Sequence, residues 1–208
     1  MTFDKLCEFL SSVMAKPIGM SRIVVREFLI LLLNTNGLEQ AQAIANRLRL
    51  EHFDAIISSP LKRALITAQQ IAKYHIHTPF LIEENLREIA FGEWEGLTWK
   101  EVEQKYGPLQ KLTPHEEFVS CSHGGDSLEQ RVESLIPVVT AWKQKYKNKC
   151  ILLSTHGYIK KGILIAFEVV TNDENLQNQR FGNTALIIIR PFDDEKIELL
   201  GDTSHLGN

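Results

Sequence analysis

The chain has 208 residues and a mass of 23.7 kDa, a length that predicts a single domain. Hydrophobic residues make up 44% of it and charged residues 24%, values that are typical of a globular protein and argue against disorder. Its formal net charge of −3 gives no global field that would attract nucleic acid or an anionic membrane, so an anionic ligand would need a local cluster of cationic side chains.

Short apolar runs alternate along the chain with longer segments whose apolar residues recur at helical spacing. In chain order the pattern predicts a strand at 22–26, a helix at 37–48, a strand at 54–58, a helix at 60–74, loops and short helices through a polar middle, a helix at 127–146, a strand at 150–154, a helix at 158–167, and strands at 184–190 and 196–200. Ser59 is the predicted N-cap of the second helix, with Pro60 at its first position. This alternation predicts an α/β fold, a three-layer α/β/α sandwich with a mainly parallel sheet.

The first predicted strand begins just after Met20, and the family resemblance described below implies that the domain starts there. We therefore expect residues 1–19 to form an N-terminal extension and residues 20–208 to form the single domain. Apolar residues within 1–19 have helical spacing, so a helix docked on the domain is the alternative.

The cysteines and the apolar runs indicate the cellular compartment of the protein. Cys7, Cys121 and Cys150 are too few and too widely spaced for a disulfide framework or a cysteine zinc site, and they suit a reducing compartment. The apolar run at 23–33 is interrupted by two charged residues and is far shorter than the ~20 residues that a bilayer span needs. The N-terminus lacks the basic start and apolar core of a signal peptide. We expect a cytoplasmic protein with no membrane association.

Three predicted strands end in polar residues that suit a phosphate, and ligands of such sheets bind beyond the carboxyl ends of the strands. The first strand ends in Arg26. The second runs into a helix start, whose backbone N–H groups could hold an anion, and Arg63 adds a forked cation there. His156 follows the strand at 150–154. Each feature also has a plainer explanation, because Ser-Ser-Pro is a good helix start and a single histidine after a strand is often only a cap or a satisfied core residue.

Five segments occur in a recognisable order: Ser58–Ala64, Leu86–Gly96, Gly124–Ser127, Ser154–Gly157 and Asn183–Thr184. Together they resemble the histidine phosphatase superfamily, which has the phosphoglycerate mutase-like fold, over about residues 21–206. The segment 86–96 is similar to the phosphatase branch rather than to the mutases. Asp126 stands where most members of the family have glutamate.

The resemblance implies a phosphomonoesterase of small phosphorylated metabolites that works through a phosphohistidine and needs no metal or other cofactor. By resemblance, Arg26, Arg63 and His156 bind the phosphoryl group, and His156 is also a catalytic residue. Glu88 is the implied proton donor to the leaving group. A solvated loop carboxylate is the alternative explanation of Glu88.

One departure from the family concerns its nucleophile. The family's first strand ends in Arg-His-Gly-Glu, and that histidine attacks phosphorus. Here Arg26 is followed by Glu27 and an apolar stretch, the phosphate loop of the family is absent, and no histidine lies between residues 1 and 51. His123 and His156 are the candidates for a replacement. The sequence therefore predicts either an impaired phosphatase or a non-catalytic descendant that binds a phosphorylated ligand or a partner protein.

Overall fold

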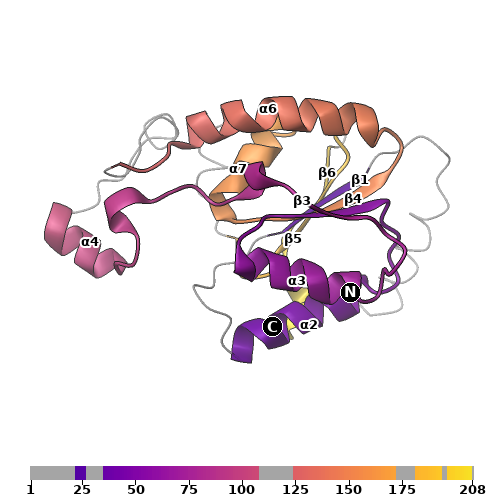
Figure 1. Ribbon diagram of the computed structural model, residues 1–208, viewed down its shortest axis with the longest axis horizontal. Helices are drawn as coiled ribbons and strands as arrows, with labels where there is room; N and C mark the ends of the chain where they lie inside the picture. The colour runs from indigo at the N-terminus through magenta and orange to yellow at the C-terminus, as the bar shows by residue number, and fades with distance from the viewer. Residues whose placement is uncertain (1–21, 27–34, 108–123, 172–180, 194–195, 208) are drawn as a thin grey trace.

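A six-stranded sheet lies between two layers of helices in the computed structural model, which describes residues 22–26, 35–107, 124–171, 181–193 and 196–207 (Figure 1). The strands are β1 (Arg22–Arg26), β2 (Ala55–Ser58), β3 (Phe80–Ile82), β4 (Cys150–Ser154), β5 (Leu186–Ile189) and β6 (Ile197–Asp202). The helices are α2 (Thr35–Leu48), α3 (Lys62–Ala72), α4 (Trp99–Tyr106), α6 (Leu128–Lys145) and α7 (Gly157–Ala166), with 3-10 turns η1 (Glu84–Leu86), η2 (Gly92–Trp94) and η3 (Ser204–Leu206). The predicted extension at 1–19 lies outside the described residues.

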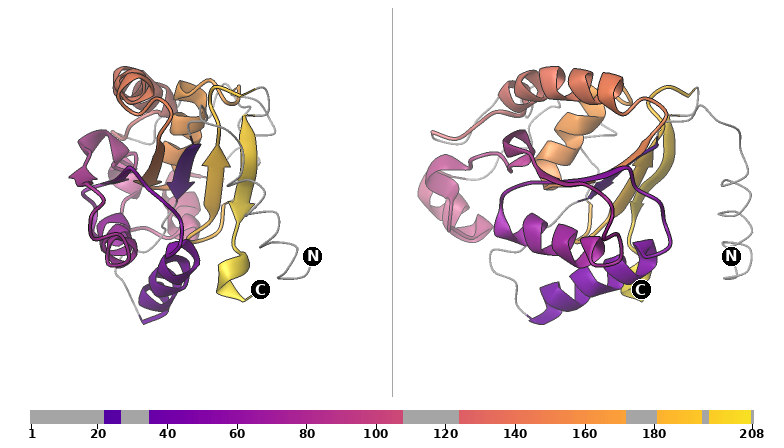
Figure 2. Two further views of the ribbon diagram at one scale, coloured as in Figure 1. Left: turned by 90° about the vertical axis from the view of Figure 1, so that its right-hand side faces the viewer. Right: turned by 45° about the vertical axis from the view of Figure 1, so that its right-hand side comes forward.

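The strand order across the sheet is β3-β2-β4-β1-β5-β6. β3, β2, β4 and β1 are parallel, whereas β5 runs antiparallel to both of its neighbours, β1 and β6. Figure 2 shows β1 inside the sheet and the yellow β6 at one edge. α6 and α7 cover one face, and α2 and α3 cover the other (Figure 1). The prediction of a three-layer α/β/α sandwich with a mainly parallel sheet is confirmed.

β2, β4 and β5 are buried along almost their whole length, which explains their continuous apolar sequences. Successive side chains of a strand point to opposite faces, so each strand supplies both layers of the core. Ile56 and Leu152 belong to the cluster beneath α2 and α3. Ile57 and Leu153, the next residues along, belong to the cluster beneath α6 and α7. In the parts of the chain that the structure describes, no helix is both long enough and apolar enough to cross a membrane.

The register of the three central parallel strands brings their carboxyl ends level. The Cα of Arg26 pairs with that of Ser154, and Ser154 pairs in turn with Ser58 on its other side. The residues that follow Ser58 and Ser154 therefore emerge at the edge of the sheet where β1 ends with Arg26. This level edge is the structural basis of the site described below.

The predicted N-cap of the second helix is wrong. α3 begins at Lys62, its N-cap is Leu61, and no side chain caps it. The Ser59 hydroxyl instead accepts the N–H of Leu61 (3.2 Å) in a turn before the helix, so Ser59 is no N-cap and Pro60 is not helical. The helix also ends at Ala72, two residues earlier than expected. The other predicted helices and strands agree with the structure to within about two residues at each end, the usual scatter of such boundaries.

α6 and α7 pack closely at Gly162. A Cβ placed on this glycine would lie 3.1 Å from Leu135 Cδ1 and 3.5 Å from Val132 Cγ2, so there is no room for a larger side chain. We expect Gly162→Leu to lower the free energy of unfolding by about 1–3 kcal/mol, because an overpacked core must shift side chains and backbone. Urea unfolding of the variant measures this loss. Ile136→Leu, on the exposed side of α6, is the control and should unfold like the wild type.

Candidate functional site

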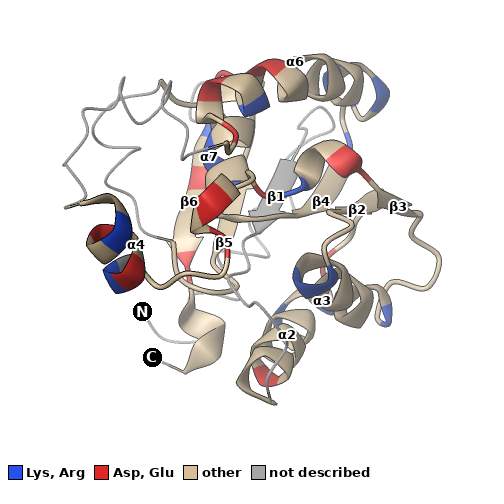
Figure 3. Ribbon diagram, turned by 60° about the vertical axis from the view of Figure 1, so that its left-hand side comes forward, with Lys and Arg blue, Asp and Glu red and all other residues tan. Residues whose placement is uncertain are grey.

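Arg63 and His156 meet at the carboxyl edge of the sheet. Arg63 lies in the first turn of α3, whose start is basic in Figure 3, and His156 is the N-cap of α7. The Arg63 Nε donates a hydrogen bond to His156 Nδ1 (3.0 Å). The other ring nitrogen, Nε2, lies 2.8 Å from the hydroxyl oxygen of Ser59. Two of the residues that the resemblance implies for phosphoryl binding, Arg63 and His156, therefore lie side by side at this edge.

The backbone around these residues is fixed by the neighbouring strand. The Ser59 N–H donates to the Ser154 carbonyl (2.8 Å), which continues the β2–β4 pairing one residue beyond β2. The Ser154 hydroxyl donates to the carbonyl of Ala64 (3.0 Å) and ties α3 to β4. His156 and Ser59 are fully buried, whereas Arg63 is half-buried. The site is therefore a buried imidazole with a guanidinium beside it.

The charge of Arg63 is shaped by burial and by two neighbouring side chains. Burial lowers the pKa of Arg63, the carboxylate of Glu88 acts to raise it, and the guanidinium of Arg87 acts to lower it further. Arginine remains protonated in proteins, so Arg63 stays a cation. Glu88 is thus close enough to Arg63 to interact with it electrostatically.

Glu88 lies on a segment that is held from two elements. The Thr155 hydroxyl donates to the carbonyl of Leu86 (2.9 Å), and Leu86 itself is fully buried. Arg131 on α6 donates from Nη2 to the carbonyl of Arg87 (3.1 Å). The Glu88 carboxylate accepts the N–H of Ile89 (3.1 Å), and its side chain is half-buried rather than fully solvated.

Asp126 connects the same segment to the start of α6. Its carboxylate accepts the N–H of Ala90 (3.1 Å), and its own N–H donates to the carbonyl of Ala90 (2.8 Å). α6 then begins with a capping box between Ser127 and Gln130. Asp126 and Ala90 are therefore joined by two hydrogen bonds, and the short side chain of aspartate is long enough to make the second one. This is a physical reason for aspartate at this position.

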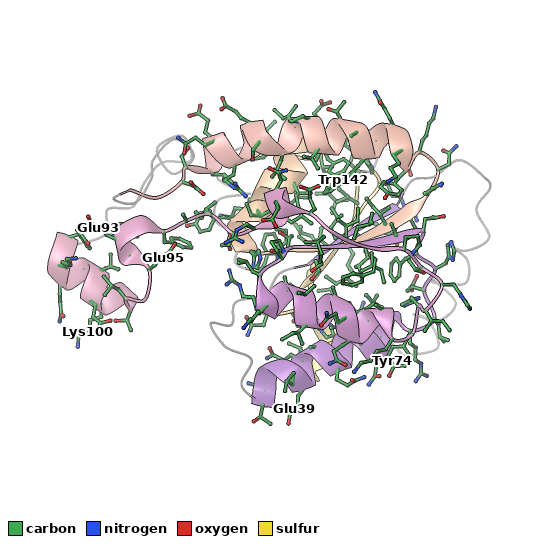
Figure 4. The ribbon with its side chains drawn as sticks, in the orientation of Figure 1. Glu39, Tyr74, Glu93, Glu95, Lys100 and Trp142 are labelled. Carbon is green, nitrogen blue, oxygen red and sulfur yellow. The ribbon has the colours of Figure 1, made fainter. Side chains whose placement is uncertain are left out.

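Arg26 is the last residue of β1, and its Cα is in register with Ser154 and Leu186. It therefore belongs to the same row of strand ends as the Arg63–His156 pair. Beyond Glu88 the chain continues to η2 and α4, which project outward at the end of the molecule where α6 begins (Figure 1). Glu93, Glu95 and Lys100 lie on this projecting part (Figure 4).

Sequence reasoning missed two buried polar residues near this edge. The sequence predicts Ser59 as a helix N-cap. Its position directly after a strand is equally typical of a residue in a binding site. Lys160 on α7 is fully buried, and its Nζ lies 4.1 Å from the ring centroid of Phe181. A pair of lysines, Lys160 and Lys161, within an otherwise mostly apolar helix is the signal that could have identified it. Within the described ranges, no three His, Cys, Asp or Glu side chains form a group that could hold a metal ion.

The chain matches the sequence profile of the histidine phosphatase superfamily (branch 1) over residues 31–203. It is 30% identical over 178 residues to phosphoglycerate mutase-like protein 4 of Arabidopsis thaliana, covering 84% of this chain and 76% of the relative. It is 29% identical over 180 residues to a metal-independent phosphoserine phosphatase of the same plant, covering 85% of this chain and 73% of the relative.

Two solved structures share the fold. A mycobacterial glucosyl-3-phosphoglycerate phosphatase superimposes with a TM-score of 0.75 at 19% identity, covering 88% of this chain and 99% of that protein. A histidine-to-alanine mutant of the Entamoeba histolytica phosphoserine phosphatase, in complex with phosphoserine, superimposes with a TM-score of 0.70 at 24% identity. This second superposition covers 90% of this chain and all of the other protein.

Proposed function

Because the chain belongs to the histidine phosphatase superfamily, branch 1, we propose that it binds the phosphoryl group of a small phosphorylated metabolite between Arg63 and His156 and hydrolyses it only slowly. The observation that carries this proposal is the 3.0 Å hydrogen bond between these two side chains, which come from distant parts of the sequence. The substrates named for the relatives, phosphoserine and glucosyl-3-phosphoglycerate, support a small phosphorylated metabolite as the ligand. The cytoplasm is the compartment that we propose, since such metabolites and reduced cysteines both occur there.

The proposed pocket supplies the groups that a phosphate monoester needs. The Arg63 guanidinium can donate two parallel hydrogen bonds to phosphoryl oxygens. The start of α7 adds backbone N–H groups and the positive end of the helix dipole, and His156 stands at that start. Arg26, at the level end of β1, is the second cation of the proposal. Glu88 is the proposed proton donor to the leaving oxygen, since its carboxylate acts on the charge of Arg63.

The slow turnover follows from the missing nucleophile. The residue after Arg26 is Glu27, and the first histidine of the chain is His52. His156 is a poor substitute because Nδ1 already accepts the N–H of Arg63 and Nε2 is engaged with Ser59. The Entamoeba histolytica mutant with a histidine replaced by alanine is in complex with phosphoserine, which supports ligand binding by this fold after the loss of a histidine.

A second candidate function is that of a binding protein with no turnover. Such a protein would bind the ligand in the same pocket of Arg63 and His156 but would not hydrolyse it at all. The rate of hydrolysis of p-nitrophenyl phosphate distinguishes it from a slow phosphatase. The absence of the family's Arg-His-Gly-Glu sequence after Arg26 is the observation that favours it.

Titration of the protein with inorganic phosphate tests the pocket. We expect Arg63→Gln to raise the Kd for phosphate by roughly 10- to 150-fold, because a hydrogen bond to a charged group contributes about 1.5–3 kcal/mol. Lys62→Gln is the matched control, since Lys62 is the exposed cation directly before Arg63 on the same helix. It should leave the Kd nearly unchanged. Equal effects of the two variants, or no binding by the wild type, would contradict the proposed pocket.

A further inference from the structure

The hydrogen bonds around His156 determine where its proton lies. The Nε of Arg63 carries a hydrogen at all accessible pH values, so the Nδ1 that accepts it must be bare. A neutral imidazole with a bare Nδ1 carries its proton on Nε2, and this N–H points at the Ser59 hydroxyl oxygen 2.8 Å away. These two hydrogen bonds therefore assign His156 as neutral and in the Nε2–H form.

Ser59 is fixed in its role as the acceptor for this proton. Its backbone N–H is bonded to Ser154, and its hydroxyl oxygen also accepts the N–H of Leu61 (3.2 Å), so the oxygen cannot move away from His156 easily. The same arrangement excludes a serine nucleophile with His156 as its base. A base needs a bare nitrogen toward the serine, and the nitrogen that faces Ser59 is the protonated one.

An oxyanion that binds the side of the guanidinium formed by Nε and one Nη competes with His156 for the Nε–H of Arg63. The guanidinium fork binds a phosphate more strongly than it binds a neutral ring nitrogen, because both partners are then charged. When Arg63 turns to the oxyanion, Nδ1 loses its donor and its lone pair faces negative oxygens. Taking up one proton from solvent removes this repulsion and turns Nδ1 into a donor, while Nε2–H stays on Ser59.

We propose that Ser59 is a positioning residue that holds His156 as the neutral Nε2–H tautomer, so that the imidazole takes up one proton at Nδ1 when an oxyanion draws Arg63 away. This inference rests on the proposed function. It adds to that function a proton that enters the pocket together with the ligand.

Charged groups on the neighbouring elements influence when His156 Nδ1 becomes protonated. Arg63 approaches from α3, Arg26 stands at the end of β1, and Lys160 and Lys161 lie on α7 itself. Of these, Arg63 donates directly to the imidazole, and its charge disfavours a positive charge on the ring. Glu88 and Arg87, on the segment after η1, act on Arg63 with opposite signs. A bound dianion instead favours the protonated imidazole of His156, because its two negative charges stabilise imidazolium.

Sulfate is the probe for the proton uptake, because it stays a dianion over the whole neutral range and releases no proton of its own. Calorimetric titrations at about pH 7.5, in buffers of different ionisation enthalpy, give the number of protons bound with each sulfate. We expect an uptake of about one proton and an affinity that falls about tenfold per pH unit above neutrality. His156→Gln should abolish the uptake while it retains weaker binding.

Ring ¹⁵N resonances of labelled histidine test the role of Ser59 without any ligand. In the wild type we expect a bare Nδ1 and a protonated Nε2 at His156. Ser59→Ala should populate the Nδ1–H tautomer, and Ser59→Thr should restore the wild-type pattern. Ser58→Ala is the matched control, because Ser58 is equally buried and its hydroxyl donates to the Ser59 carbonyl instead of contacting His156.

The outcomes separate this inference from the proposed function. Sulfate binding without proton uptake, or identical ¹⁵N spectra for Ser59→Ala and Ser58→Ala, overturns the inference and leaves the pocket intact. Failure of both sulfate and inorganic phosphate to bind overturns the two together. If Ser59→Ala does not fold, the ring ¹⁵N pattern and the proton count of the wild type still decide whether His156 is the Nε2–H tautomer and takes up a proton at Nδ1.

Discussion

Assayed beside a histidine phosphatase that carries the nucleophile, this chain is expected to hydrolyse p-nitrophenyl phosphate at least about 10,000-fold more slowly. The substrate has a good leaving group, so the assay depends on attack at phosphorus and little on Glu88 as a proton donor. Attack needs an imidazole about 3–3.5 Å from phosphorus and in line with the leaving group. The sequence offers no histidine directly after Arg26, and both ring nitrogens of His156 are engaged.

The control for this assay is His156→Ala. Residual turnover that is equally low in the wild type and in this variant would come from a contaminant or from binding alone. A turnover comparable to that of the reference phosphatase, lost in His156→Ala and measured on protein whose mass matches the sequence, would contradict the prediction. It would show that His156 attacks phosphorus in spite of its contacts.

The second large effect is expected for Leu86→Ala, which should lower the free energy of unfolding by about 2–5 kcal/mol. Leu86 is fully buried in the cluster beneath α6 and α7, and it anchors the segment that carries Glu88 two residues later. Its removal leaves a cavity that the helix above it can fill only in part. Denaturant unfolding followed by circular dichroism measures the loss.

Leu50→Ala is the matched control for this experiment. Leu50 is 81% exposed, so the same deletion of side-chain atoms should change the free energy of unfolding by less than about 0.5 kcal/mol. Equal stabilities of the two variants would mean that the segment before Glu88 does not depend on its anchor. The position of Glu88 near Arg63 would then need another cause.

The proximity of Arg63 and His156 could be predicted from sequence because it follows from topology. Parallel strands present their carboxyl ends at one edge, so residues that follow two adjacent strands are brought together whatever their separation in sequence. The family resemblance of the segments 58–64 and 154–157 then singled out Arg63 and His156 among the residues at this edge. Arg26 was placed in the same row by the same reasoning.

Ser59 and β3 could not be predicted, and the reasons differ. A serine before a helical pattern is a typical N-cap, and only the tertiary contact with His156 gives it another role. β3 has three residues, two of them exposed, so its sequence carries no strand periodicity. It is a strand because β2 supplies the pairing partner.

The supports of Glu88 were also hidden from sequence reasoning. Arg131 reads as one more charge on the polar side of a helix, yet it binds the Arg87 carbonyl on a segment more than forty residues earlier. Asp126 reads as a substitution within a motif, and only its reciprocal bonds with Ala90 show what the side chain does. Long-range bonds between a side chain and a backbone carbonyl leave no periodic signal in the chain.

The interior position of β1 has a consequence for how the protein is made. Among the strands that the structure describes, β1 is synthesised first, but its two partners in the sheet are β4 and β5, which lie in the second half of the chain. At about 5–20 residues per second, β1 waits roughly 6–25 s before β4 has even been synthesised. During this time an Ile- and Val-rich strand has no native partner, and such exposed strands are prone to aggregation. Yield during expression should therefore depend on chaperones and on the rate of translation more than the stability of the finished fold would suggest.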